Sequence, residues 1–285
     1  MTIEEINTKI VKLSDVAKEI GNEPKEITLP NGQTKMSLYW DAQSAQEAVK
    51  YTTSLASSNQ KIVFDGPVPA WFAASLSHSV HPMPVGLNDP KIGVVDIPQA
   101  QKGEPDPDCG VEFVVTEGRN FVRIDWQLTD LVYDAANLNK IVLPEIPAGK
   151  EVILGGGPDM PKSGKGPNYI AVTIGEAYAH TNKSVSYYQP KSNGYVCGIT
   201  HWPQRHIGDI IPMAEIEKDL TSGKDIGKDF FGGETPDFSN ATPPKEGGDI
   251  RSSELAMSAK EKLSQDKDYK ERLVDLDKQQ VDHSI

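Results

Sequence analysis

The sequence has 285 residues, of which 37% are hydrophobic, enough to build one large domain or two smaller ones. Its formal net charge of −12 argues against a protein that coats nucleic acid non-specifically by neutralising phosphates. With two cysteines, a charged N-terminus and no apolar run near the roughly 18 residues of a membrane span, we expect a cytoplasmic protein with no membrane partner.

In chain order, the first half of the sequence predicts a helix and then alternating strands and helices. Apolar residues recur at helical spacing over residues 1–22, where Thr2 and Glu5 form a capping-box pattern. EITLPNGQTKMSLYW predicts a hairpin, because Asn-Gly tolerates the positive φ angles of a type I′ turn. The segments that follow predict a helix, a strand, a helix and two strands: SAQEAVKYTTSLAS, KIVFDG, PAWFAASLSHS, PVGLND and GVVDI.

The second half repeats this order with a period of roughly 90 residues. VEFVVTEGRNFVRIDW predicts a hairpin that ends on Trp126, as the first hairpin ends on Trp40, so we expect these two residues to be equivalent. The later segments also match in order: KEVILGG, GPNYIAVTIGEAYAH and SVSYYQPKSNGYVCGI. Two copies of one unit suggest a fused version of a symmetric dimer.

These patterns divide the chain into five parts. We expect an N-terminal helix over 1–22, a first repeat over 23–99, a linker over 100–110 and a second repeat over 111–213. Residues 214–285 are predicted to form an acidic, largely disordered tail that could contain a helix, because they are rich in charge, proline and glycine.

The repeated unit resembles a family of small proteins from type III CRISPR systems, the third ring-nuclease family. The resemblance rests on SGKGPNY, AYAHT, YYQPKSNGYVCGITH and IGDII in the second repeat, and independently on DGPVPAW, HSVHP and NDPKIGVV in the first. It covers about residues 35–212. The fold that it implies is α/β, with two tandem sheet-plus-helices units resembling CRISPR-associated Rossmann-like domains and forming a pseudo-dimer.

The resemblance also implies a function. Members of the family bind cyclic tetra-adenylate on a two-fold axis and linearise this messenger with stimulation by manganese, which switches off type III CRISPR signalling. They have also been described as deadenylating RNA exonucleases. We therefore expect a cyclic oligoadenylate as the ligand, bound between the two repeats or across a homodimer. Manganese is the one cofactor that the resemblance suggests.

The family's site residues are divided between the two repeats. His180 and His201 match family histidines in the second repeat, but Gln189 and Lys191 replace the family's Asp and Arg between them. The first repeat lacks the terminal histidine but matches the family at three positions, His81, Asp89 and Lys91. Neither repeat holds the full set, which places cleavage in doubt more than binding.

These residue types suit the cleavage of an RNA linkage by internal attack of a 2′-hydroxyl. The reaction needs a base, an acid and a cation beside the phosphate. Histidine can act as base or acid near neutral pH, and lysine supplies positive charge without the bidentate fork of arginine. The candidate catalytic residues are therefore His81, Asp89, Lys91, His180, Lys191 and His201. A histidine beside a turn can equally be a surface or capping residue.

A glycine-rich run before a predicted helix is a second candidate for ligand binding. It is not a P-loop, because Gly166 stands where Ser or Thr must follow Gly-Lys. Its backbone amides and the helix N-terminus could still hold a phosphate. With Gln189, the candidate binding residues are Ser163, Gly164, Lys165 and Gly166, and a flexible loop is the alternative.

The sequence predicts no dedicated metal site, and three hypotheses for function remain. His201, His206 and Asp209 could together hold manganese, but their spacing is not specific. The first hypothesis is a cyclic tetra-adenylate protein that cleaves its ligand slowly. The second is a binder without activity, which Gln189 and the missing histidine of the first repeat favour. The third is a structural protein whose diverged repeats assemble with a partner.

Overall fold

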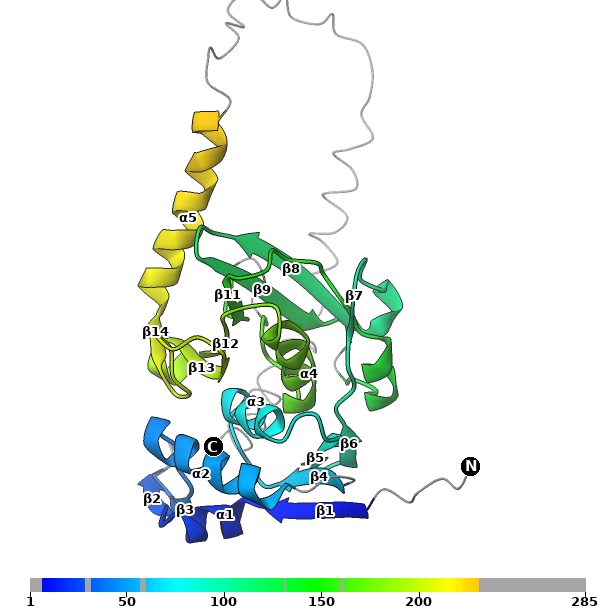
Figure 1. Cartoon of the computed structure of the whole chain (residues 1–285), viewed down its shortest axis with the longest axis vertical. Coiled ribbons are helices and arrows are strands. Elements are labelled where there is room, and N and C mark those ends of the chain that lie inside the picture. Colours follow the sequence, from blue (N-terminus) through cyan, green and yellow to red (C-terminus); the bar gives the residue numbers. More distant parts are fainter. Residues whose placement is uncertain are drawn as a thin grey trace, which may run out of the picture. The chain divides into compact units, whose positions relative to one another are not determined.

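A computed structural model describes residues 7–28, 32–56, 60–130, 132–158, 160 and 162–230, without the side chains of residue 107 and of residues 223–230. This part of the chain has a mixed α/β fold in which helices α3 and α4 lie between two sheets (Figure 1). None of its helices combines the length and the apolar composition needed to cross a membrane.

The first sheet has four strands in the order β1-β4-β5-β6. They are β1 (Asn7–Lys12), β4 (Gln60–Asp65), β5 (Val85–Asp89) and β6 (Gly93–Asp96). The first three are parallel, and β6 pairs antiparallel with β5. Helix α3 (Ala70–Ser79) connects β4 to β5, and helix α2 (Ala42–Leu55) packs beside α3. The predicted segments from residue 44 to residue 97 are thus confirmed as elements of these types.

The prediction of one N-terminal helix is wrong for residues 7–12, which form strand β1, and helix α1 (Leu13–Glu19) begins only after it. Strand β1 pairs with β4 over six positions, and this pairing outweighs the local helical spacing of apolar residues. Side chains accordingly alternate, with Ile10 60% exposed and Val11 buried. The capping-box residues Thr2 and Glu5 lie outside the described residues.

The predicted first hairpin is confirmed as β2 (Lys25–Thr28) and β3 (Thr34–Ser37), which form a two-stranded sheet of their own. The expected equivalence of Trp40 and Trp126 is therefore wrong. Trp40 follows this separate hairpin and packs on Phe72, whereas Trp126 lies within a strand of the second sheet. The strand that contains Trp126 lies beside β11 in the second sheet. The corresponding position in the first sheet, beside β4, is occupied by β1 and not by a strand of the hairpin.

The second sheet has six strands in the order β14-β13-β12-β11-β9-β8. The strands are β8 (Val111–Glu117), β9 (Phe121–Leu128), β11 (Glu151–Leu154), β12 (Ser184–Gln189), β13 (Gly194–Thr200) and β14 (Ile210–Pro212). Strands β9, β11 and β12 are parallel, and β13 pairs antiparallel with β12. The run β9-β11-β12-β13 thus has the same sequence of strand directions as β1-β4-β5-β6. Helix α4 (Asn168–Ala179) connects β11 to β12.

The remaining elements are short and lie in the connections between the strands and helices of the two sheets. Residues 100–110, predicted as a linker, contain β7 (Gln101–Lys102), which pairs with β10 (Val142–Leu143), and the 3₁₀ turn η1 (Pro107–Cys109). Two further 3₁₀ turns are η2 (Ala135–Lys140) and η3 (Pro190–Ser192).

Helix α5 (Met213–Phe230) covers one face of the second sheet, and it begins where the tail was predicted to begin. Its Ile216 and Leu220 are buried against Phe121, Ile153 and Tyr195. The carboxylate of Asp219 accepts hydrogen bonds from the amides of Asn120 and Phe121 in the β8–β9 turn. Residues 231–285 lie outside the described part of the chain.

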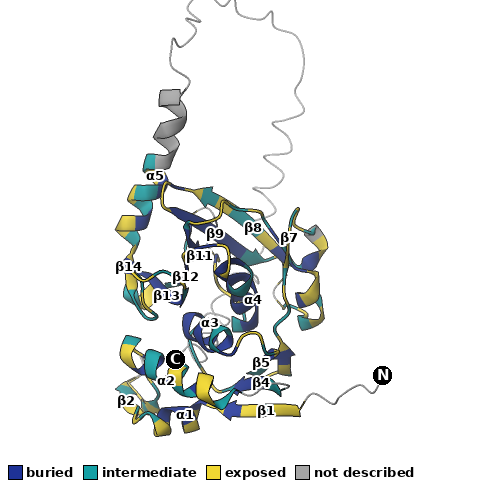
Figure 2. Cartoon of the chain, viewed as in Figure 1, coloured by how far each residue is buried: buried dark blue, intermediate teal, exposed yellow. Residues whose placement is uncertain are grey.

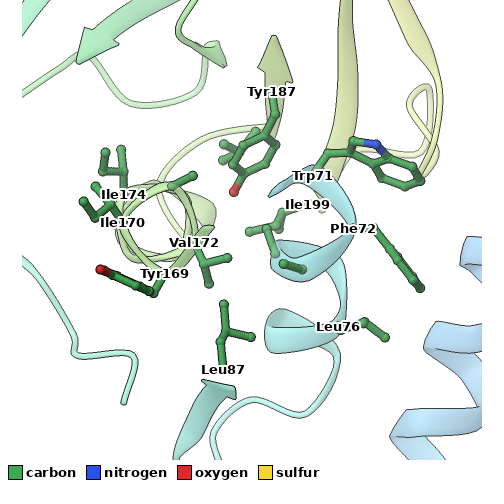
Figure 3. Packing of buried hydrophobic residues seen from close by; sticks show 14 of the residues in the cluster. Trp71, Phe72, Leu76, Leu87, Tyr169, Ile170, Val172, Ile174, Tyr187 and Ile199 are labelled. Atoms are coloured by element: carbon green, nitrogen blue, oxygen red, sulfur yellow. The ribbon is translucent and has the colours of Figure 1, made fainter. Parts of the chain in front are cut away.

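Helices α3 and α4 pack against each other and run in the same direction. Near their N-terminal ends, the side-chain amide of Asn168 donates to the Val68 carbonyl at 2.7 Å. At their C-terminal ends, the rings of His78 and His180 are 5.3 Å apart. Figure 3 shows Val172 and Ile199 between the two helices. Most of both helices is buried, whereas α2 and β1 carry exposed residues (Figure 2).

Two glycines allow α3 and α4 to pack closely on the second sheet. A Cβ on Gly198 of β13 would lie 2.5 Å from the carbonyl oxygen of Trp71 in α3, so only glycine lets the helix approach the strand this closely. A Cβ on Gly175 of α4 would lie 1.8 Å from the hydroxyl of Tyr187. That hydroxyl is buried and has no hydrogen-bond partner among the described residues.

We therefore expect Gly175→Ala to lower the free energy of unfolding by about 1–3 kcal/mol, because the added methyl overlaps the buried hydroxyl of Tyr187. Tyr187→Phe alone should be nearly neutral, since it removes an unpaired hydroxyl. The double variant Gly175→Ala/Tyr187→Phe should recover much of the lost free energy of unfolding. Urea unfolding of the three variants measures this coupling, and additive effects would contradict the packing described.

Candidate functional site

Four of the six histidines of the chain gather at the C-terminal ends of α3 and α4. His78 lies in the last turn of α3, and His81 follows the end of that helix. His180 is the C-cap of α4, and His201 comes directly after β13. Side chains from both halves of the chain thus form one group, which we call the histidine cluster.

The imidazole rings of the cluster are close neighbours. The ring centroid of His78 lies 5.3 Å from that of His180 and 5.0 Å from that of His201, and the centroids of His180 and His201 are 5.7 Å apart. The His81 ring is 4.9 Å from the His180 ring. The shortest contact joins Nε2 of His78 to Nε2 of His201 at 3.1 Å. The side chain of His78 is mostly buried, and the other three histidines are exposed.

Glu176 fixes the orientation of His78. Its Oε2 atom lies 2.9 Å from Nδ1 of His78, so Nδ1–H donates to the carboxylate. When His78 is neutral, its Nε2 then carries a lone pair and accepts the hydrogen bond from Nε2–H of His201. This chain of two hydrogen bonds joins α4, α3 and the end of β13.

The electrostatic environment favours the neutral imidazoles of His180 and His201. Partial burial lowers the pKa of His180, and the positive charges that His78 and His81 can carry lower it further, as does Lys102, against the opposing effect of Glu176. Burial likewise lowers the pKa of His201, assisted by His78 and His180. Four adjacent rings cannot all be charged at low cost, because like charges repel.

Cationic side chains flank the cluster. The Nζ of Lys102 lies 4.9 Å from the ring centroid of Tyr178 and donates to the hydroxyl of Thr181. The Nζ of Lys183 lies 4.8 Å from the ring centroid of Trp202, which follows His201. A negatively charged group that approaches the histidines from this side would therefore meet two lysines and a partly buried aromatic ring.

The other predicted catalytic residues, and the predicted binding residue Gln189, lie at the opposite edge of the sheets. Asp89 ends β5 and Lys91 follows it, while Gln189 ends β12 and Lys191 lies in η3. Strand β12 begins near the histidines and ends at Gln189, and its six residues span about 17 Å. Within a single chain these residues therefore do not share one site with His81, His180 and His201, because the chain crosses each sheet between the two sets.

Asp89 stabilises the turn that follows β5. Its Oδ1 atom accepts the amide of Lys91 at 2.8 Å, as expected for an Asx turn. The turn closes with Gly93 at φ 84°, and the corresponding turn of the second half closes with Asn193 at φ 45°. Both turns therefore use a left-handed residue, and each presents one lysine.

The glycine-rich run is held from inside the protein. The Ser163 hydroxyl donates to Asp125 at 2.6 Å, and the amides of Gly164 and Lys165 donate to the carbonyls of Trp126 and Lys162. These three donors, predicted to bind phosphate, are thus engaged within the protein. A Cβ on Gly166 would lie 2.8 Å from the Trp126 ring, so this glycine also serves packing.

Buried charges anchor the same run. Asp125 is 1% exposed and accepts hydrogen bonds from the Gly157 amide and from Nε of Arg123. Arg123 also binds Glu217 of α5 through Nη1 at 2.6 Å. The loop between β11 and α4 is therefore fixed to the sheet and, through Arg123, to α5.

One member of the histidine cluster, His78, and its hydrogen-bond partner Glu176 were not predicted from the sequence. His78 precedes His81 by three residues in HSVH, the spacing that places two side chains on one face of a helix end. Glu176 precedes His180 by four residues on α4, which is also a same-face spacing. Both spacings are visible in the sequence, but only the structure places the two helix ends together.

The alternative manganese site does not form as predicted. His201 contacts His78, whereas the ring of His206 lies 3.5 Å from the carboxylate of Asp209, whose Oδ2 also accepts the His206 amide. As the side chains stand, no three His, Cys, Asp or Glu side chains of the described residues are arranged to hold a metal ion. Manganese prefers oxygen ligands, so the imidazole-rich cluster does not fit it well.

Comparison of the chain with protein-family models and with curated protein sequences finds no match.

The lowered pKa values of His180 and His201 predict how stability depends on pH. Below the ordinary pKa of 6.5, the unfolded chain binds protons that the folded chain resists, so stability should fall as the pH drops from about 7.5 to about 5.5. The double variant His180→Gln/His201→Gln should lose less stability over the same pH range. Thermal unfolding of both proteins at the two pH values, with a chelator present, measures the difference. An equal loss in the two proteins would contradict the assignment.

Proposed function

We propose that the protein binds a cyclic oligoadenylate, most simply cyclic tetra-adenylate, at the edge formed by the N-terminal ends of α3 and α4. The observation that carries the proposal is the parallel pairing of these helices, whose N-termini meet at Val68 and Asn168. The positive ends of two helix dipoles therefore lie side by side, and such ends favour anions. The same edge carries the carboxyl ends of the parallel strands, where open α/β sheets commonly bind ligands.

We further infer that the two halves are diverged copies of one unit, related by an approximate two-fold axis between α3 and α4. The matching strand directions of the two sheets and the common direction of the two helices support this inference. A ligand with two-fold symmetry, such as cyclic tetra-adenylate, suits an axis of this kind. The family resemblance of residues 35–212 points to the same ligand.

Lysines at this edge complement a phosphate ligand. Lys91 and Lys191 occupy equivalent places in the two turns, and Lys165 precedes α4. A lysine interacts with a phosphate as a point charge in ground and transition states alike, so these residues suit binding more than rate enhancement.

Binding without turnover is the activity that a single chain supports best. Cleavage through a 2′-hydroxyl needs an acid or base within hydrogen-bond reach of the reacting atoms. The histidine cluster lies about 17 Å or more from the proposed binding edge, at the other end of the strands. In this role the protein would sequester the messenger and so switch off type III CRISPR signalling.

Slow cleavage is the second candidate, and the lowered pKa values of His180 and His201 favour it. Neutral imidazoles beside Lys102 and Lys183 have the chemistry of a nuclease that uses general acid–base catalysis. For this function the ligand would have to bind at the cluster.

Labelled cyclic tetra-adenylate added to the full-length protein distinguishes the candidates. Stoichiometric retention of the intact ring supports sequestration. Linear products that form with turnover and are lost in His180→Ala support cleavage at the histidine cluster. If the ring is neither bound nor cleaved, the proposal is wrong.

We expect Lys91→Ala and Lys191→Ala each to weaken binding about tenfold, which corresponds to about 1.4 kcal/mol, because each removes a charge that faces phosphate. Lys183→Ala at the opposite edge is the matched control and should leave the affinity unchanged. Equilibrium filter binding at fixed ionic strength gives the three values. Equal effects of Lys183→Ala and Lys191→Ala would exclude the edge assigned here.

A further inference from the structure

We propose that His78, His180 and His201 form a binding site for one divalent metal ion that prefers nitrogen ligands, such as zinc, cobalt or nickel. This inference does not depend on the oligoadenylate ligand, because it rests on the geometry of the histidine cluster alone.

The separations within the cluster match those of imidazoles that share one ion. Zinc–nitrogen bonds of about 2.0–2.1 Å in a tetrahedral site place two ligand nitrogens about 3.3 Å apart and two imidazole centroids about 5 Å apart. The Nε2 atoms of His78 and His201 are 3.1 Å apart, and the three centroid separations are 5.0, 5.3 and 5.7 Å. A metal ion bound to both nitrogens would replace this hydrogen bond, and the proton of His201 would move through solvent from its Nε2 to its Nδ1 atom, so that the ring stays neutral.

Glu176 supplies the support that metal-binding histidines usually have. Its carboxylate accepts Nδ1–H of His78 at 2.9 Å, which leaves the Nε2 lone pair directed at the other rings. A carboxylate behind a histidine in this way fixes the tautomer and raises the basicity of the ligand nitrogen. The Glu176 side chain is only 16% exposed, so its position is set by packing on α4.

The helix ends beside the cluster also favour a cation. The C-terminal ends of α3 and α4 both face this region, and the negative ends of helix dipoles attract positive charge. Histidine binds a metal ion through a neutral imidazole nitrogen. Lys102, which donates to Thr181, and Lys183, which lies over the Trp202 ring, oppose a cation, so the helix ends and Glu176 have to outweigh these two charges.

Binding requires a local movement. As the side chains stand, no three of the described ligand-type residues are arranged to hold an ion. The His78 and His201 nitrogens already face each other, so the exposed ring of His180 has to turn its nitrogen toward them. Exposed side chains change rotamer within nanoseconds. The fourth position can be filled by water or by His81, whose ring lies 4.9 Å from that of His180.

Titration of the chelator-treated full-length protein with cobalt(II) and with zinc(II) tests the proposal. We expect one ion per chain, the visible absorption of tetrahedral cobalt(II) bound to nitrogen, and displacement of cobalt by zinc. His78→Ala and His201→Gln should each abolish this signal, and Glu176→Gln should weaken zinc binding about 10- to 100-fold. His206→Gln, which alters an exposed histidine outside the cluster, is the matched control and should bind normally.

Circular dichroism of each variant establishes that the fold is retained. A folded His201→Gln protein that binds zinc as tightly as the unaltered protein would overturn the proposal. Absence of any zinc-dependent calorimetric signal in the unaltered protein would overturn it as well. Neither result depends on oligoadenylate binding, so this proposal and the proposed function can fail separately.

Discussion

The structure depends on the side-by-side packing of two helices that run in the same direction. Helices α3 and α4 share one core with both sheets, and the glycines at 175 and 198 permit the close contacts. Parallel helices have ends of equal polarity, so the pair has one end that suits anions and one that suits cations. The lysine-bearing turns lie at the first end and the histidine cluster at the second.

Most of the fold could be predicted from the sequence because local patterns agree with the tertiary structure. The strands and helices from residue 44 to residue 97 and from residue 111 to residue 199 follow their apolar periodicity and turn residues closely. The first residues of the described chain are the exception. There, pairing of β1 with β4 decides the conformation, and no local pattern reports a partner that lies some 50 residues away.

The candidate site was only partly predictable. Spacing along the chain correctly draws attention to His81, His180 and His201, and the structure places them together. Spacing along the chain does not show at which edge of a sheet a residue lies. Asp89 and Lys191 were therefore wrongly grouped with the histidines. His78 and Glu176 could not be assigned from the sequence alone, because their role depends on the contact between two helix ends.

The ion pair between Arg123 and Glu217 has a mechanical consequence for the loop that precedes α4. Arg123 is buried and is shared by Asp125, which fastens the loop, and by Glu217 of α5. Any force or partner that lifts α5 from its sheet removes one of the two carboxylates from a buried guanidinium. Arg123 would then be paired with Asp125 alone, so the contacts that hold α5 on its sheet and those that hold the glycine-rich loop share one guanidinium.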